Sequence, residues 1–191
     1  MPKLNLSQDP EADKLLSKDP LALLIGMVLD QQVPLEWAFA APAELKRRLG
    51  GHLDSRTISS MDPDEFARAF TAKPALHRYP ASMAKRVQEM CRIVEDEYSG
   101  DASRIWKGVS SGAELLSRLK ALPGFGDQKA RIFVALLGKQ LGVRPPGWED
   151  VSMPYSEPGS TRSVADIVGP ESLATVRAFK QQMKSKAKQG S

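Results

Sequence analysis

A tight turn between two helical segments constrains the fold of this chain more than any other feature. Residues 122–126 read Leu-Pro-Gly-Phe-Gly. The glycines at 124 and 126 permit positive φ angles and close approach of another surface, because they have no Cβ atom. Successive N–H groups in such a turn, next to a helix N-terminus, attract a phosphate. Ordinary helix–helix connections also contain glycine, so the turn alone leaves open whether it binds a ligand.

The segments on both sides of this turn have helical periodicity. Apolar residues recur after it at Ile132, Phe133, Leu136 and Leu137, and residues 113–121 precede it with a similar pattern. The sequence therefore predicts a helix–hairpin–helix unit over residues 113–138, and residues 122–126 are called the hairpin below.

The rest of the chain is also predicted to be helical, in a single all-α domain over residues 1–191. Asp19-Pro20 begins a helix, because a proline in the first turn loses no needed N–H group. Pro42 should kink or divide a second helix. No segment shows the pattern of a strand. The helices expected before the hairpin cover residues 20–29, 35–49, from 63 onward, and 82–98.

The sequence changes character after Gly142. Residues 143–160 are rich in proline, glycine and serine, without periodicity, and unstructured loops of this length are usually functional or disordered. Two aromatic residues and an acidic pair favour an ordered loop. A last helix should start near Ser163, with a bend at Pro170, and end in a basic tail, so that this part covers residues 163–191. Such tails occur in nucleic-acid-binding proteins and also as solvated, frayed termini.

Composition excludes several classes of protein. The 191 residues carry a net charge of +4, which is compatible with a polyanionic partner. Cys91 is the only cysteine, so an internal disulfide and an iron–sulfur cluster held by four cysteines are excluded. With only two histidines, no metal site is expected. No apolar run reaches the roughly 18 residues of a membrane span, and no signal sequence is evident, so we expect a cytoplasmic protein without a membrane partner.

Three segments, in this order, resemble the helix–hairpin–helix DNA glycosylase superfamily. They are Leu-Leu-Ile-Gly-Met-Val-Leu-Asp-Gln-Gln at 23–32, Ala-Ser-Met-Ala-Lys-Arg at 81–86, and the hairpin. The superfamily includes endonuclease III, MutY-like adenine glycosylases and the alkyladenine glycosylases. The resemblance covers about residues 18–150 and is that of a short, divergent member. It implies two small helical lobes with a cleft between them.

The resemblance implies base-excision repair of double-stranded DNA by a monomer. Such enzymes hydrolyse the N-glycosidic bond of a damaged base, alkylated or oxidised, that is flipped out of the duplex. The hairpin would hold a DNA phosphate, and members of the family often bind a monovalent cation there. The early Gln-Gln pair would lie near the lesion, although it also reads as a simple helix end. The DNA-binding residues implied are Gly124, Phe125, Gly126, Gln128, Lys129, Gln31 and Gln32.

Family members that also cleave the DNA strand carry a lysine shortly after the second hairpin glycine, as the nucleophile of a Schiff base. That position is Gln128 here, and an amide cannot form a Schiff base. Lys129 is adjacent, but one residue along a helix turns a side chain by about 100°, away from the same site. The resemblance therefore implies a monofunctional glycosylase.

The family's catalytic carboxylate stabilises positive charge on the sugar as the base departs. Asp150 is the expected counterpart and Glu149 the second choice. In the family this aspartate opens a helix, whereas residues 152–159 do not look helical, and both acids also read as exposed loop residues. A catalytically inactive DNA-binding protein on the same scaffold is thus the alternative. Acids at the mouth of a cleft favour the enzyme, and acids facing solvent favour the binding protein.

One residue opposes tight phosphate binding at the hairpin. Asp127 should cap the following helix by accepting its unpaired N–H groups, and its charge would repel a phosphate there. The cations of Lys120, Lys129 and Arg131 would offset this repulsion if they face the same side. No cofactor is expected apart from the monovalent cation that the resemblance implies.

Overall fold

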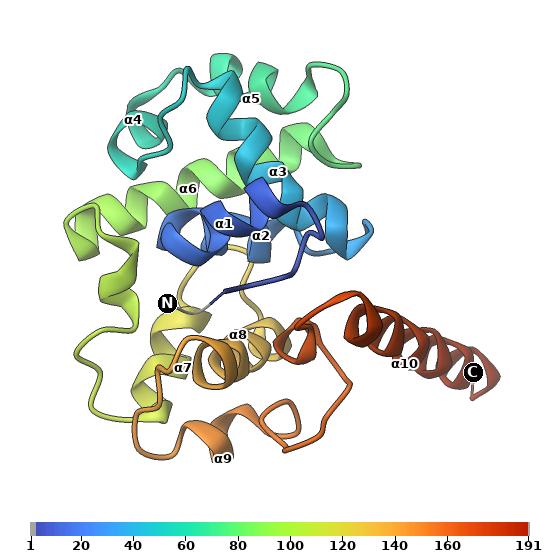
Figure 1. Ribbon diagram of the computed structural model, residues 1–191. Coiled ribbons are helices and arrows are strands. Elements are labelled where there is room, and N and C mark those ends of the chain that lie inside the picture. Colours follow the sequence, from blue (N-terminus) through green and yellow to red (C-terminus); the bar gives the residue numbers. More distant parts are fainter. Residues whose placement is uncertain (1–2, 191) are drawn as a thin grey trace.

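The computed structural model describes residues 3–190 and contains only helices in that range (Figure 1). The predicted all-α class is therefore confirmed. The α-helices are α1 (Pro10–Lys18), α2 (Pro20–Leu29), α3 (Leu35–Arg48), α4 (Ser55–Ser60), α5 (Pro63–Thr71), α6 (Pro80–Tyr98), α7 (Gly112–Lys120), α8 (Asp127–Gln140), α9 (Trp148–Ser152) and α10 (Pro170–Gln189), with short 3₁₀ helices η1 (Ala102–Ile105) and η2 (Val164–Asp166).

An aspartate followed by a proline begins three of these helices. The carboxylate of Asp9 accepts a hydrogen bond from the amide of residue 11, at 2.9 Å. Asp19 and Asp62 make the equivalent bond two residues ahead, at 2.9 and 3.0 Å. Each carboxylate satisfies a donor that the first helical turn leaves unpaired, and the proline that follows has no donor to satisfy. The Asp-Pro pairs therefore fix where α1, α2 and α5 start.

Of the two outcomes expected at Pro42, a kink or a division of the second long helix, the division does not occur. α3 runs unbroken from Leu35 to Arg48, with Pro42 buried inside it. A proline in a helix removes one hydrogen bond, and the burial of neighbouring apolar side chains outweighs this loss. Phe39 lies so close to α2 that a Cβ atom added to Gly26 would be 2.6 Å from its ring. The glycine is what allows α2 and α3 to pack this closely.

The helices form two groups that share one hydrophobic core (Figure 1). The chain from α1 to α6 makes the first group, with α2 and α6 in contact at its centre. α7, α8 and α9 pack on one another in the second. The hairpin joins α7 to α8 within this second group, as predicted from the sequence.

The C-terminal part differs from the sequence prediction in two ways. Residues 143–160 contain the short helix α9, because Trp148 packs against Gly112 of α7 and Gly138 of α8. A Cβ atom added to Gly138 would lie 2.3 Å from the indole, and one added to Gly112 would lie 2.7 Å from the backbone of Trp148. The last helix begins at Pro170 instead of bending there, and residues 164–166 form a separate 3₁₀ turn.

α10 projects from the rest of the molecule (Figure 1). Leu173 and Val176 anchor its first half in the core, whereas every residue from 181 to 190 is exposed. No helix in the described part of the chain is both long and apolar enough to cross a membrane.

Candidate functional site

The hairpin has the tight geometry that its glycines predict. Gly124 has a φ of +84°, in the left-handed region. The amide of Phe125 donates a hydrogen bond to the carbonyl of Leu122, at 3.1 Å. The ring of Phe125 is buried, 5.9 Å from that of Phe133. Phe125 is therefore a core residue whose N–H group is already used, and a phosphate at the hairpin would have to use the amides of Gly124 and Gly126.

The two hairpin glycines differ in their surroundings. A Cβ atom on Gly124 would lie 2.8 Å from Cδ of Arg86, so that side chain would have to move. A Cβ atom on Gly126 would meet nothing within 4 Å, and its φ of −73° is one that any residue adopts. Gly124 is thus required by the turn itself, whereas the space in front of Gly126 is open to a ligand.

The predicted capping role of Asp127 is wrong. Gly126 is the N-cap of α8, and no side chain caps it. Asp127, the first residue of the helix, is exposed and pairs with Arg131 at 2.7 Å and Lys120 at 3.3 Å. The hydrogen bond from Arg131 chiefly lowers the pKa of Asp127. Two of the cations expected to attract a phosphate are therefore engaged in balancing this acid.

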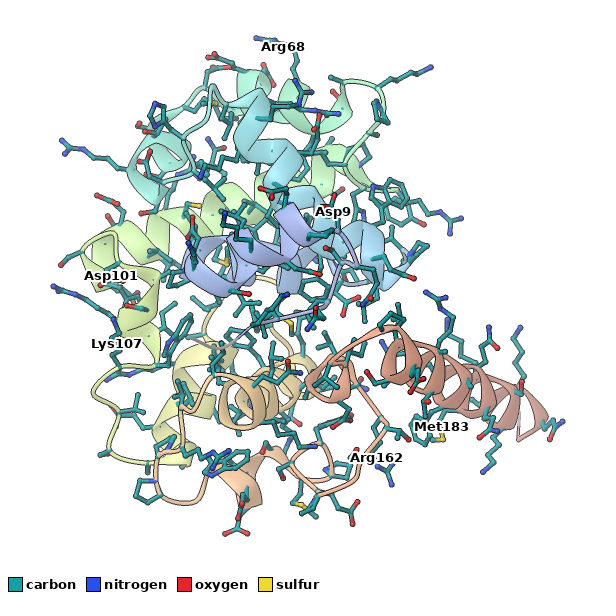
Figure 2. The ribbon with its side chains drawn as sticks, in the orientation of Figure 1. Asp9, Arg68, Asp101, Lys107, Arg162 and Met183 are labelled. Atoms are coloured by element: carbon teal, nitrogen blue, oxygen red, sulfur yellow. The ribbon has the colours of Figure 1, made fainter. Side chains whose placement is uncertain are left out.

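A pocket of about 460 Å³ adjoins the first turn of α8. Its walls come from the end of α2, from α8, from the segment between α9 and α10, and from α10. Figure 2 labels Arg162 and Met183, which belong to its outer wall. The lining residues are Met27, Asp30, Gln31, Gln128, Lys129, Ile132, Pro154, Tyr155, Arg162, Phe179, Lys180, Met183 and Lys184.

Asp30 and Lys129 place opposite charges in this pocket. The ammonium of Lys129 donates a hydrogen bond to the carbonyl of Val28, at 3.2 Å. Burial lowers the pKa of Lys129 to about 8, against the opposing effect of the nearby Asp30. Burial also raises the pKa of Asp30, while the ammoniums of Lys180 and Lys129 act to lower it. Both shifts have the same origin, because a charged group loses hydration in a partly closed site.

The structure brings Lys129 to the pocket despite its rotation from Gln128 along the helix. Gln128 and Lys129 both line the pocket. Successive residues of a helix are rotated by about 100°. The pocket nevertheless extends around the first turn of α8, and the long side chain of Lys129 reaches back to α2. Lys129 is therefore directed toward α2 and not toward the hairpin.

The Gln-Gln pair lies at the end of α2. The amide of Gln31 is 3.3 Å from the sulfur of Met83, and the residue lines the pocket. Gln32 is exposed in the turn that follows, with a φ of +57°, and lines a second, larger groove beside α10. Gln31 therefore lines both hollows, whereas Gln32 lines only the groove beside α10.

A buried histidine fixes the shape of this turn. Nε2 of His77 is 3.1 Å from the carbonyl of Leu29 and 3.0 Å from that of Gln31, while Nδ1 accepts a hydrogen bond from the amide of Tyr79, at 3.0 Å. Two acceptors at Nε2 and a donor at Nδ1 require a neutral ring with its proton on Nε2. Burial is the main reason that the pKa of His77 is lowered.

Asp150 and Glu149 do not lie in the pocket. Both are exposed in the first turn of α9, and neither lines the cavity beside α8. Asp30, which sequence reasoning passed over, is the acid that the fold brings there. The sequence shows only that Asp30 follows the apolar run 21–29 and precedes the Gln-Gln pair.

Comparison with known proteins adds no assignment. No protein-family model matches the chain, and no curated protein matches its sequence. Among residues 3–190, no group of three or more histidine, cysteine or acidic side chains is arranged to hold a metal ion.

Proposed function

We propose that this protein is a helix–hairpin–helix DNA glycosylase that removes a damaged base from double-stranded DNA. One observation carries the proposal. The carboxylate of Asp30 lies beside Lys129 in a pocket that adjoins the first turn of the hairpin's second helix. Perturbed ionisable groups in a concave site are typical of active sites. Two walls of the pocket, the end of α2 and α8, lie in the part of the chain that resembles the superfamily.

In this proposal the pocket receives the flipped base. Its volume of about 460 Å³ falls within the range of small-molecule sites. Tyr155 and Phe179 on its walls offer aromatic surface for the base. The amides of Gly124 and Gly126 would hold the DNA backbone beside it. The two groups of helices then correspond to the two lobes of the family scaffold.

Asp30 takes the role that the sequence suggested for Asp150. As the N-glycosidic bond breaks, the sugar gains oxocarbenium character, and an ionised carboxylate close to it lowers the barrier. The ammoniums of Lys129 and Lys180 favour the ionised form of Asp30. Gln128 stands at the family's lyase position, and the ammonium of Lys129 is hydrogen-bonded to the carbonyl of Val28, so the proposed reaction ends at the abasic site.

A second candidate is a DNA-binding protein without catalysis. The exposure of Asp150 and Glu149 favours it, because these were the acids expected by analogy with the family. Under this alternative, Asp30 and Lys129 are a partly buried pair with no part in a reaction.

A panel of duplexes, each containing one damaged base, tests the two candidates. Strand breaks after alkali treatment report base loss. We expect cleavage of at least one duplex, lost in Asp30→Asn and retained in Asp150→Asn, which is the matched control. Loss in Asp150→Asn alone would return the role to that residue. Duplex binding without any cleavage across a broad panel would favour the non-catalytic candidate.

A further inference from the structure

We propose that the groove between α10 and the turn joining α2 to α3 binds a single strand of nucleic acid. This groove, called the α10 groove below, has a volume of about 1060 Å³. Binding of a single strand in this groove goes beyond the proposed function, because it needs neither the hairpin nor excision of a base. The groove and the pocket share four lining residues, so the two hollows are neighbours: Asp30, Gln31, Lys180 and Lys184.

The α10 groove carries an excess of positive charge. Four cations line it, those of Arg78, Arg177, Lys180 and Lys184, against the two acids Asp30 and Glu36. Glu36 is already paired with Arg177, and Asp30 faces Lys129 and Lys180. The surplus attracts a chain of phosphates, whose binding releases condensed counterions.

Successive cations of α10 lie on one face of the helix. Arg177, Lys180 and Lys184 are spaced by three and four residues, and residues at these spacings are neighbours on a helix surface. Beyond them, α10 projects from the body with every residue from 181 to 190 exposed (Figure 1). Lys186 and Lys188 continue the positive charge along it. A strand bound in the groove can therefore continue along the helix.

An aromatic side chain on the opposite wall distinguishes this groove from a merely basic surface. Trp37 is 39% exposed and lines the groove. Its indole stacks on His77, with 6.5 Å between the ring centres and 27° between the planes. The imidazole thus supports the indole, while the exposed area faces the groove. Stacking of a base on such a ring tolerates any sequence, because every base has a π face.

The combination of a stacking ring and a row of cations favours a single strand over a duplex. In a duplex the faces of the bases are covered by their neighbours, so only an unpaired base can lie on Trp37. An acidic peptide would use the cations but has no need of the ring. The two kinds of partner are therefore separated by their dependence on Trp37.

Tryptophan fluorescence tests the inference directly, since Trp106 is almost fully buried and Trp148 packs against Gly138. Oligothymidylate added to the full chain should quench the emission. Trp37→Ala should remove most of this quenching and weaken binding, measured by anisotropy of a labelled oligonucleotide, about fivefold or more. Thermal unfolding of the variant should remain cooperative, because the ring lies at the surface of the groove and is 39% exposed.

Paired substitutions of cations provide the electrostatic test. Arg78→Gln with Lys184→Gln should flatten the slope of log affinity against log salt by about 1.4, from roughly 0.7 for each lost phosphate contact on a single strand. Lys14→Gln with Lys18→Gln, on a separate hollow formed by α1 and α3, is the matched control and should leave the slope unchanged. Equal effects of the two pairs would overturn the inference. Polyglutamate binding as tightly as oligothymidylate, and independently of Trp37, would also overturn it.

Failure of single-strand binding in the α10 groove can be distinguished from failure of the proposed glycosylase function. Gly126→Ala should leave oligothymidylate binding intact, since the hairpin does not line the α10 groove. Single-strand binding without any base excision would refute the glycosylase and support the groove. Base excision without quenching by oligothymidylate would support the glycosylase and refute single-strand binding in the α10 groove.

Discussion

The ammonium of Lys129 on α8 donates a hydrogen bond to the main-chain carbonyl of Val28 on α2, across a distance of 3.2 Å and 101 residues of sequence. The bond joins the hairpin's second helix to the end of the early helix, two residues before Asp30. It joins the first of the three segments that carry the family resemblance to the helix that follows the hairpin. The relative position of Asp30 and the hairpin therefore depends on a buried cation.

Replacing Asp30 should raise stability while abolishing base excision. Burial raises the pKa of Asp30 above its ordinary value, so the folded protein binds more protons than the unfolded chain once the pH exceeds the unfolded pKa. The free energy of unfolding contributed by Asp30 therefore falls as the pH rises through that window. We expect Asp30→Asn to have a higher melting temperature than the wild type at pH 7.

The difference between Asp30→Asn and the wild type should shrink as the pH falls through the raised folded pKa toward about 4, and should level off at lower pH, where the carboxyl becomes protonated in both states. Differential scanning calorimetry of both proteins at several pH values measures this difference in melting temperature. A lower melting temperature for Asp30→Asn at pH 7 would contradict this prediction, because it would show that the Asp30 carboxylate stabilises the fold.

Lys129 should make stability rise with pH above neutrality. Its pKa is about 8 in the folded protein, below the 10.5 of the free side chain, so between these values the unfolded chain binds more protons. The free energy of unfolding should then increase across this window, by an amount of order 1–3 kcal/mol. Burial raises the pKa of the Cys91 thiol, which acts in the opposite direction, so the contribution of Lys129 must be measured as a difference.

Urea unfolding of Lys129→Met and the wild type between pH 7 and 10 gives that difference. The effect of Cys91 is common to both proteins and cancels. The free energy of unfolding of the wild type should rise relative to that of Lys129→Met from pH 7 toward pH 10. A constant difference across the range would mean that Lys129 keeps an ordinary pKa and is well hydrated.

Much of the fold could be predicted from the sequence because its signals are local. The Asp-Pro pairs mark the starts of helices, and the glycines of the hairpin mark a turn whose Gly124 adopts the expected positive φ. Whether Pro42 divides α3 could not be predicted from local signals, because α3 also packs closely against Gly26 of another helix.

The candidate site was less predictable because its members come from distant parts of the chain. Analogy placed the carboxylate at Asp150 by counting from the hairpin. The packing of Trp148 on Gly112 and Gly138 instead fixes α9, with Asp150 exposed on it. The approach of Asp30 to Lys129 has no local signature, since it follows from how α2 and α8 meet.

His77 should be needed to hold the end of α2. Its ring joins the carbonyls of Leu29 and Gln31 to the amide of Tyr79. His77→Ala leaves these groups without partners and should cost about 1–3 kcal/mol of unfolding free energy. Because burial lowers the pKa of His77, its stabilising effect is present above pH 6.5 and is lost as the pH falls through the folded pKa.

Chemical denaturation at pH 7.5 and pH 5 measures both effects of His77. The gap between His77→Ala and the wild type should narrow at the lower pH, where the ring becomes charged and gives up its acceptor at Nδ1. His52→Ala, which changes an exposed histidine, is the control and should leave stability nearly unchanged. A gap that widens at pH 5 would contradict the assigned tautomer.

Gly126→Ala should separate DNA binding from folding. The added methyl group meets no atom of the protein within 4 Å, and the φ of −73° suits alanine, so stability should change by less than about 1 kcal/mol. The same methyl group stands where a phosphate would approach the hairpin amides and should weaken duplex binding.

Gly138→Ala is the opposite case, since its methyl group would overlap Trp148 and should cost about 1–3 kcal/mol or more of unfolding free energy. Duplex affinity at fixed salt and urea midpoints for the two variants give the test, and unchanged affinity in Gly126→Ala would mean that the hairpin does not hold DNA.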